Sequence, residues 1–312
     1  MRCAAVFPGQ GSQSVGMLKA LSEHSPVITR TFEEASTALG TDLWALTQQG
    51  PESLLNATEN TQPAMLAAGV AVWRVWQARG GVTPVVMAGH SLGEYTALVC
   101  AGGLDFAEAV KLVAERGRRM QAAIPEGQGS MAAVLGLTDD QVREACAQSA
   151  QGQVVAAVNF NSPGQVVIAG DTAAVERAMA AAQTLGAKRV LKLPVSVPSH
   201  CALMRPAAAL FRASLDAIGI STVNVPVIHN YDVAIHSDPD EIRAALEAQL
   251  YQPVRWVETV QRMAREGVTH LIELGPGKVL TGLVKRIDKQ LDAACVHDPA
   301  SLEAVFATCT GA

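Results

Sequence analysis

The chain has 312 residues, of which 49% are hydrophobic and 17% are charged, and its formal net charge at pH 7 is −5. This balance is typical of a globular protein and excludes a largely disordered chain. The negative charge argues against nucleic acid as a general partner, and the apolar runs stop well short of the roughly 20 residues that a membrane-spanning helix needs. We therefore expect a cytoplasmic protein that binds neither nucleic acid nor membrane.

The first part of the chain alternates strands with helices, which predicts a parallel sheet with helices on both faces. A short apolar strand, Ala4–Phe7, leads into a glycine-rich loop over residues 8–13 that opens a helix. The next expected elements are helices at 28–39 and 62–79, a strand at 85–88 followed by a helix from Glu94, and a long helix from Phe106 to Ala123 with Asp105 as its N-cap.

A serine stands between two glycines at the turn after the strand at 85–88. The sequence Gly89-His90-Ser91-Leu92-Gly93 matches the G-x-S-x-G nucleophile elbow, in which the glycines permit a very sharp turn. Such an elbow holds the Ser91 hydroxyl at the carboxyl end of the strand and leaves the backbone N–H of Leu92 facing a developing oxyanion. A serine in an ordinary strand-to-helix turn is the alternative that the motif alone leaves open.

The pattern changes after residue 125. Residues 131–193 are expected to form a strand, a helix, two strands, a helix and a strand, which is the βαββαβ order of a ferredoxin-like unit. The rest of the chain is expected to form a strand at 225–228, helices at 240–250 and 254–265, a strand at 270–274 and a closing glycine-rich turn at 275–277. We therefore expect an α/β fold: a large α/β-hydrolase-like domain of residues 1–125 and 195–312 with a parallel-sheet core, and an inserted ferredoxin-like subdomain of residues 126–194.

A serine nucleophile needs a base, most often a histidine. His200 is the best of the seven histidines, because it lies in the constrained loop Pro198-Ser199-His200. His90 is next to Ser91, but neighbouring side chains of a tight elbow point in different directions. The acidic residues weighed as a third member of a triad all fall on helix starts or exposed faces of the subdomain: Asp139, Asp140, Glu144, Asp171 and Glu176. A neutral group, such as a backbone carbonyl, would then orient the histidine.

Arg116 interrupts the apolar stripe of the helix at 106–123. Phe106, Val110, Val113 and Met120 follow helical spacing, and Arg116 falls on the same face. A buried guanidinium needs a partner, and its fork matches a carboxylate. Pairing with an internal Asp or Glu, or extension of the side chain to solvent, remains open at this point.

The glycine-rich loop at 8–13 lacks the Lys-Ser/Thr pair of a phosphate-binding P-loop. One of its backbone N–H groups could instead be a second oxyanion donor. The six cysteines are scattered without C-x-x-C pairing or metal-ligand spacing, so we expect reduced thiols and no metal.

Taken together, these motifs resemble the malonyl-CoA:acyl-carrier-protein transacylases of bacterial fatty-acid synthesis. The resemblance runs almost end to end and depends on five motifs in order: the loop at 8–13, the elbow at 89–95, Arg116, the segment 159–165 and the segment 198–200. It implies an S-malonyltransferase in which a malonyl group passes from malonyl-CoA to Ser91 and then to the phosphopantetheine thiol of an acyl carrier protein. No cofactor bound to this chain is implied, and we expect a monomer.

The resemblance also implies residue roles. Ser91 is the nucleophile and His200 its base, and the backbone amides of Gln10 and Leu92 form the oxyanion hole. Arg116 binds the malonyl carboxylate. The remaining matches are Gln249, which orients the histidine through a neutral acceptor, and His90 and Asn161, which line the site.

The implied carrier protein is acidic, so we expect a basic rim near the site. Its candidate residues are Lys188, Arg189, Lys192, Arg205, Lys278, Lys285, Arg286 and Lys289. Three alternatives remain: a transacylase of polyketide synthesis or malonate decarboxylation, a serine esterase or thioesterase that uses water as acceptor, and a non-catalytic binding module.

Overall fold

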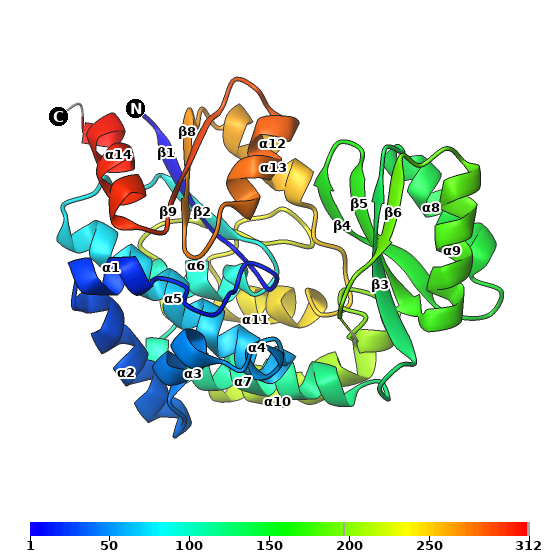
Figure 1. Cartoon of the computed structure of the whole chain (residues 1–312), viewed down its shortest axis with the longest axis horizontal. Helices are drawn as coiled ribbons and strands as arrows, with labels where there is room; N and C mark the ends of the chain where they lie inside the picture. Colours follow the sequence, from blue (N-terminus) through cyan, green and yellow to red (C-terminus); the bar gives the residue numbers. More distant parts are fainter. Residues whose placement is uncertain (196, 311–312) are drawn as a thin grey trace.

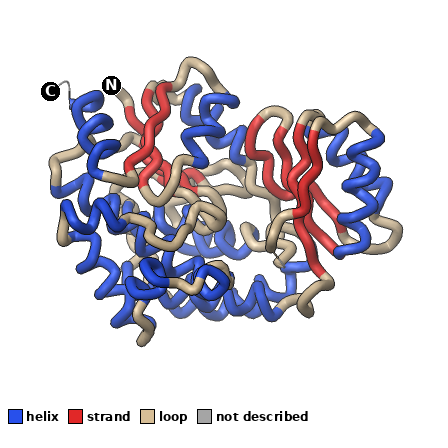
Figure 2. The backbone as a smooth tube through the Cα atoms, in the orientation of Figure 1, coloured by secondary structure: helices blue, strands red, loops and turns tan. Residues whose placement is uncertain are grey.

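The computed structural model describes residues 1–195 and 197–310, and its strands form two separate sheets (Figures 1 and 2). The larger sheet is parallel, in the order β7-β2-β1-β8-β9. Its strands are β1 Cys3–Phe7, β2 Val86–Gly89, β7 Val227–Ile228, β8 His270–Leu274 and β9 Asp292–Val296. The predicted α/β fold with a parallel-sheet core is confirmed.

Helices cover both faces of the parallel sheet, because its central strand is apolar on both sides. Alternate residues of β1 belong to two different cores: Ala5 and Phe7 to one, Ala4 and Val6 to the other. The first core contains α2 Val27–Leu39, α5 Thr58–Ala78, α6 Gly93–Cys100, α7 Phe106–Ala122 and α10 Arg205–Ala217, and the second contains α12 Trp256–Arg265 and α13 Val279–Ile287. The other helices are α1 Lys19–His24, α3 Leu43–Gln49, α4 Glu52–Leu55, α11 Pro239–Ala248, α14 Pro299–Thr310 and the 3-10 helix η1 Ala202–Met204.

The smaller sheet is antiparallel, with the order β4-β5-β3-β6. In chain order, the elements of this part of the chain are β3 Gly129–Leu135, α8 Asp139–Ser149, β4 Val155–Ser162, β5 Gln165–Asp171, α9 Thr172–Thr184 and β6 Arg189–Lys192. This is the predicted βαββαβ order with the strand arrangement of a ferredoxin-like unit. The helices α8 and α9 lie on its outer side in Figure 1. The domain limits at 126 and 194 stay a prediction.

The end of the chain differs from the expectation of a closing glycine turn. After that turn the structure adds α13, β9 and α14. The start of α13 is stabilised from β8: the buried Glu273 carboxylate accepts hydrogen bonds from the backbone N–H groups of Leu280 and Thr281. The helix predicted at 62–79 also begins earlier, at Thr58. In the described part of the chain, the helices are too short or too polar to span a membrane.

Candidate active site

The carboxyl end of β2 turns into α6 at Ser91, as the elbow motif predicts. Ser91 has a φ of 52°, a left-handed conformation that is rare outside glycine. Glycine is required at the two flanking positions because a side chain there would collide with backbone atoms. A Cβ at Gly89 would lie 1.8 Å from the backbone carbon of Gly93, and a Cβ at Gly93 would lie 2.1 Å from the Phe7 oxygen. The start of α6 therefore lies too close to the end of β2 for a side chain at Gly89, and too close to the end of β1 for a side chain at Gly93.

His200 lies beside the serine. Its Nε2 is 2.8 Å from Ser91 Oγ, and its Nδ1 is 2.7 Å from the backbone oxygen of Gln249. A carbonyl oxygen only accepts hydrogen bonds, so Nδ1 carries the proton and Nε2 is free to take one from Ser91. Burial, followed by the nearby charge of Arg116, lowers the pKa of His200 to about 3. The imidazole is therefore neutral near pH 7, which is the form that a general base needs.

Arg116 is buried beside the same serine, with 1% of its surface exposed. Its Nη2 donates to Gln249 Oε1 at 2.8 Å and reaches Ser91 Oγ at 3.4 Å, while its Nη1 donates to Gln62 Oε1 at 2.8 Å. The two alternatives from the sequence, pairing with an internal carboxylate and extension to solvent, do not describe this side chain. Its close partners are neutral amide oxygens, which leave the guanidinium charge for a ligand.

Gln249 contacts three elements of the site. The histidine is bonded to its backbone oxygen, so orientation of His200 does not depend on the side chain. The side chain instead accepts from Arg116 and donates from Nε2 to the Ser91 backbone oxygen and to Glu94 Oε2, both at 2.9 Å. Gln249 is itself fully buried.

The two predicted oxyanion donors lie at the same cavity. Gln10 follows β1 and Leu92 follows Ser91, and both line a cavity of about 130 Å³ together with Ser91, Arg116 and His200. The pairing of β1 with β2 ends at Phe7 and Gly89, which brings the loop at 8–13 to the elbow. Neither backbone N–H has a hydrogen-bond partner among the described residues.

His90 and Asn161 are also near the elbow, but in different ways. His90 lines the cavity, and its Nε2 lies 2.8 Å from Asn161 Oδ1. This contact joins the elbow to β4 of the antiparallel sheet. Burial lowers the pKa of His90, which keeps it neutral, but its hydrogen bond is to Asn161 and not to Ser91.

Four further residues of the site were missed by sequence reasoning. Gln62 on α5 binds Arg116, whereas Glu94, His229 and Asn230 form a buried group behind the elbow. Glu94 Oε1 is 2.7 Å from His229 Nδ1, and Glu94 Oε2 accepts from the backbone N–H of Asn230 at 3.0 Å. The sequence signal that could have pointed to this group is Glu94 itself, a glutamate directly after the G-x-S-x-G turn and before a largely apolar helix, and the structure buries it fully.

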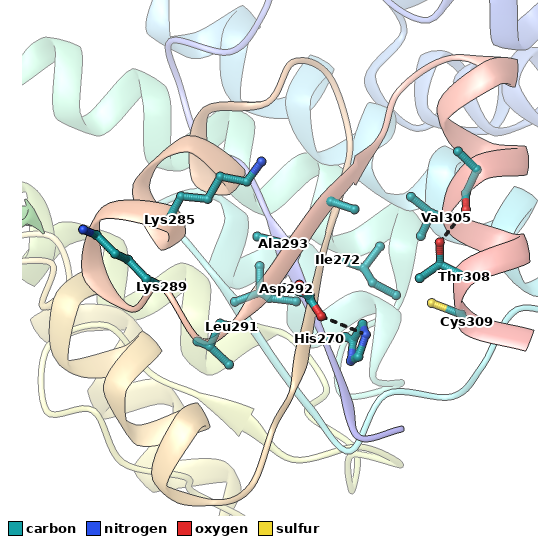
Figure 3. A pocket seen from close by; sticks show the side chains of 13 residues that line it. His270, Ile272, Lys285, Lys289, Leu291, Asp292, Ala293, Val305, Thr308 and Cys309 are labelled. Carbon is teal, nitrogen blue, oxygen red and sulfur yellow. Dashed lines mark hydrogen bonds and ion pairs between the residues drawn. The ribbon is translucent and has the colours of Figure 1, made fainter. Parts of the chain in front are cut away.

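A larger cavity lies elsewhere. Figure 3 shows this space of about 680 Å³, lined by β8, β9, α13 and α14. His270 and Asp292, 3.4 Å apart, begin β8 and β9, so this cavity reaches the amino ends of the strands, opposite the edge that carries Ser91. Open parallel sheets bind ligands at the carboxyl ends. Across residues 1–195 and 197–310, no group of three or more His, Cys, Asp or Glu side chains could hold a metal ion.

The chain is similar to proteins of known kind over nearly its full length. The model of the acyl transferase domain family matches residues 5–305. A protein of Salmonella typhimurium named malonyl CoA-acyl carrier protein transacylase is 60% identical over 303 residues, which cover 97% of this chain and 98% of that protein. A protein of the same name from Bacillus subtilis is 43% identical over 308 residues, covering 98% and 97%.

Solved structures agree with these matches. An acyl carrier protein S-malonyltransferase from Vibrio cholerae superposes with a TM-score of 0.96 at 58% identity, covering 98% of this chain and 100% of that chain. A malonyl-transacylase solved in complex with a type II PKS acyl-carrier protein superposes with a TM-score of 0.98 at 56% identity, covering 99% and 100%.

Proposed function

The chain belongs to the acyl transferase domain family and is an acyltransferase, and on that premise we propose that it moves a malonyl group from malonyl-CoA to an acyl carrier protein through an ester on Ser91. The observation that carries the choice of acyl group is the position of Arg116. Its Nη2 is 3.4 Å from the attacking oxygen, in a buried site where a guanidinium strongly prefers an anionic partner.

The fork of Arg116 fits a malonyl carboxylate. An arginine side chain has five N–H donors, and three hydrogen bonds account for its contacts with Gln62, Gln249 and Ser91. The Nη2 contact with Ser91 Oγ, at 3.4 Å, is the long one of the three, so we infer that this donor turns to the malonyl carboxylate when the acyl group is bound. An acetyl group would leave the same charge without an anion, so the site favours acyl groups that end in a carboxylate.

The first half of the proposed reaction forms the ester. Ser91 Oγ attacks the thioester carbon while His200 Nε2 takes its proton, and the N–H groups of Gln10 and Leu92 stabilise the oxyanion. The carbon–sulfur bond then breaks, and the proton passes from His200 to the CoA sulfur. The neutral state and the 2.8 Å contact of His200 support its role as base.

The second half regenerates the serine. The phosphopantetheine thiol of the carrier protein gives its proton to His200 and attacks the ester carbon, and the Ser91 oxygen leaves with that proton. This ping-pong scheme needs no cofactor on the chain, because the phosphopantetheine arrives with its carrier. In this scheme His90 lines the cavity, and Asn161 holds the His90 ring through the 2.8 Å contact of its Oδ1 with His90 Nε2.

Two acceptors are consistent with the family: a carrier protein of fatty-acid synthesis and one of polyketide synthesis. The names of the curated relatives favour an acyl carrier protein in general, and the solved complex at 56% identity contains a carrier of the polyketide type. We propose the fatty-acid carrier as the physiological acceptor, with the polyketide carrier as second candidate. Transfer rates to both purified carriers, measured side by side, would distinguish them.

The experiment that tests the proposal is the intact mass of the protein after incubation with malonyl-CoA. We expect a mass increase of one malonyl group in the wild type and none in Ser91→Ala. Addition of a carrier protein with its phosphopantetheine should remove the group and load it on the carrier. Release of free malonate at the same rate without a carrier would indicate a thioesterase instead, and an adduct on Ser91→Ala would refute Ser91 as nucleophile.

A further inference from the structure

The elbow receives support from both strands that flank β2. On one side, β1 leads to Gln10 at the cavity. On the other side, β7 ends at Ile228, and the next two residues are His229 and Asn230. In a parallel sheet the carboxyl ends of adjacent strands meet at one edge, so the segment after β7 lies directly against the elbow.

Asn230 joins the two sides of the serine turn with one side chain. Its Oδ1 accepts the backbone N–H of Ser91 at 2.7 Å, and its Nδ2 donates to the backbone oxygen of Gly89 at 2.7 Å. Asn230 is 1% exposed. The orientation of the amide is fixed by its partners, because a backbone N–H only donates and a carbonyl oxygen only accepts. Only an amide, or another group with one donor and one acceptor, satisfies both contacts.

The contact falls at the strained residue of the turn. A non-glycine residue with a φ of 52° costs free energy and persists only where its surroundings hold it. The hydrogen bonds of Asn230 act on the two backbone groups that define this turn, the oxygen of Gly89 and the N–H of Ser91. They also engage the Ser91 N–H, so that Leu92 is the elbow residue whose N–H is available to an oxyanion.

We propose that Asn230 is a positioning residue that holds the backbone of Ser91 in the conformation needed for attack, without touching the substrate. This inference rests on the proposed function for its substrate, malonyl-CoA. Asn230 is not among the residues that line the cavity. Its effect is therefore expected on the rate of acylation and not on the binding or choice of the acyl group.

Glu94 and His229 hold Asn230 in turn. The Asn230 backbone N–H donates to Glu94 Oε2, and the other oxygen of Glu94 is bonded to His229 Nδ1. Glu94 and His229 are both fully buried. The backbone oxygen of Asn230 accepts from the N–H of Arg255 at 3.1 Å. The loop after β7 is thus tied to α6 and to the start of α12, and it presents the amide in one position.

The first test compares Asn230→Ala with the wild type in rapid-mixing acylation by malonyl-CoA and by acetyl-CoA. We expect the acylation rate constant to fall about 10- to 100-fold for both donors, because the Ser91 N–H loses its acceptor and a small misplacement of the nucleophile is costly. The malonyl-CoA concentration that gives half of the maximal acylation rate, and the preference for malonyl over acetyl, should not change. Asn224→Ala, at an exposed position just before β7, is the matched control and should behave as wild type.

The second test uses Asn230→Asp and a pH series. A protonated aspartic acid imitates the amide, with one oxygen accepting from Ser91 and the O–H donating to Gly89. An ionised aspartate places a second oxygen against the Gly89 oxygen and repels it. The titratable groups around this position are Glu94, His229 and Arg255, and burial next to the Glu94 carboxylate raises the pKa of an introduced carboxyl. The rate of this variant divided by that of wild type should therefore rise from about pH 8 to about pH 6.

Several results would overturn the inference. A wild-type acylation rate in Asn230→Ala, a selective loss of malonyl over acetyl, or a flat ratio for Asn230→Asp would each do so. If Asn230→Ala does not fold, the pH series of Asn230→Asp alone decides. The Ser91-dependent burst with p-nitrophenyl acetate separates this inference from the proposed function. Failure of malonyl-CoA to acylate the wild type refutes the function, while the burst rates of the variants still test Asn230.

Discussion

The guanidinium of Arg116 donates a 2.8 Å hydrogen bond to the side-chain oxygen of Gln249. The backbone oxygen of the same glutamine is 2.7 Å from His200 Nδ1. One residue therefore positions both the group proposed to select the acyl chain and the proposed base, but through separate atoms. The two functions can be separated by changing the side chain alone.

Gln249→Ala should weaken the selection of malonyl more than the chemistry. The backbone oxygen stays, so His200 keeps its acceptor, whereas Arg116 loses one amide partner. Loss of a hydrogen bond to a charged group predicts an additional fall of about 10-fold or more in kcat/KM for malonyl-CoA relative to acetyl-CoA. Steady-state kinetics with both donors would check this. Equal losses for the two donors would show that the side chain serves the elbow alone.

Arg116→Ala should abolish the preference for malonyl. Without the guanidinium, the malonyl carboxylate would be desolvated with no partner, which predicts a fall of about 100-fold or more in kcat/KM for malonyl-CoA. Acetyl transfer should fall much less. The matched control is Arg118→Ala on the same helix, because Arg118 is exposed and pairs with Glu115. If the control and Arg116→Ala gave the same profile, Arg116 would have no role in selection.

The sequence was informative where function depends on local spacing. The glycines around Ser91, the stripe that contains Arg116 and the prolines near His200 are patterns within a few residues of each other, and the structure places all three residues together. A neutral acceptor for the histidine was also predicted, and the backbone oxygen of Gln249 has that position. The roles assigned to these residues stay predictions.

Partners that come from distant segments could not be read from the sequence. Asn230 and Gln62 have no local motif, and they reach the site only because β7 and α5 pack where they do. The last part of the fold was missed for a related reason. The strand β9 is a half-buried edge strand without clear alternation, and α13 begins where Glu273 on β8 accepts its free N–H groups.

The pH dependence of stability provides a test of the buried state of His200. Its folded pKa of about 3 lies below the ordinary value of 6.5, so the unfolded chain takes up the proton first as pH falls. The contribution of His200 to the free energy of unfolding is fully present above pH 6.5. It is lost as pH falls toward 3, by about 1.4 kcal/mol per pH unit. His200→Gln removes the titration. The free energy of unfolding, measured with denaturant at a series of pH values, should fall less steeply toward acid pH in the variant than in the wild type. Parallel pH curves for the two proteins would contradict the prediction.

Two helical glycines should respond oppositely to alanine. A Cβ at Gly93 would meet the Phe7 backbone oxygen at 2.1 Å, whereas a Cβ at Gly282 on α13 would meet nothing within 4 Å. Gly93→Ala should therefore lower the unfolding free energy by several kcal/mol and abolish acylation, because the backbone must move. Gly282→Ala should raise it by about 0.5–1 kcal/mol through helix propensity. Thermal unfolding compares the two, and a stable, active Gly93→Ala would refute the elbow geometry.

Charge reversal at Lys285 and Arg286 tests the predicted basic rim. These residues lie in the last turn of α13. Arg286 donates to Gln165 at the start of β5, whereas Lys285 lines the cavity in Figure 3, which reaches the edge of the sheet opposite Ser91, so the variant tests whether the rim extends to this side. Lys192 is a weaker candidate, because Glu176 already neutralises it at 2.9 Å. Reversal of both charges to Glu should raise the KM for the acidic carrier protein about 3- to 10-fold at low salt, with less effect at high salt.

The KM for malonyl-CoA should not change in this double variant, because neither residue lines the cavity at Ser91. Lys19→Glu, on an exposed residue of α1 outside the predicted rim, gives the same charge change per site as a control. Equal effects in the control would mean that net charge alone governs the encounter. An unchanged KM for the carrier in the double variant would place the docking surface on another part of the rim, since a charged interface on α13 must weaken when its sign is reversed.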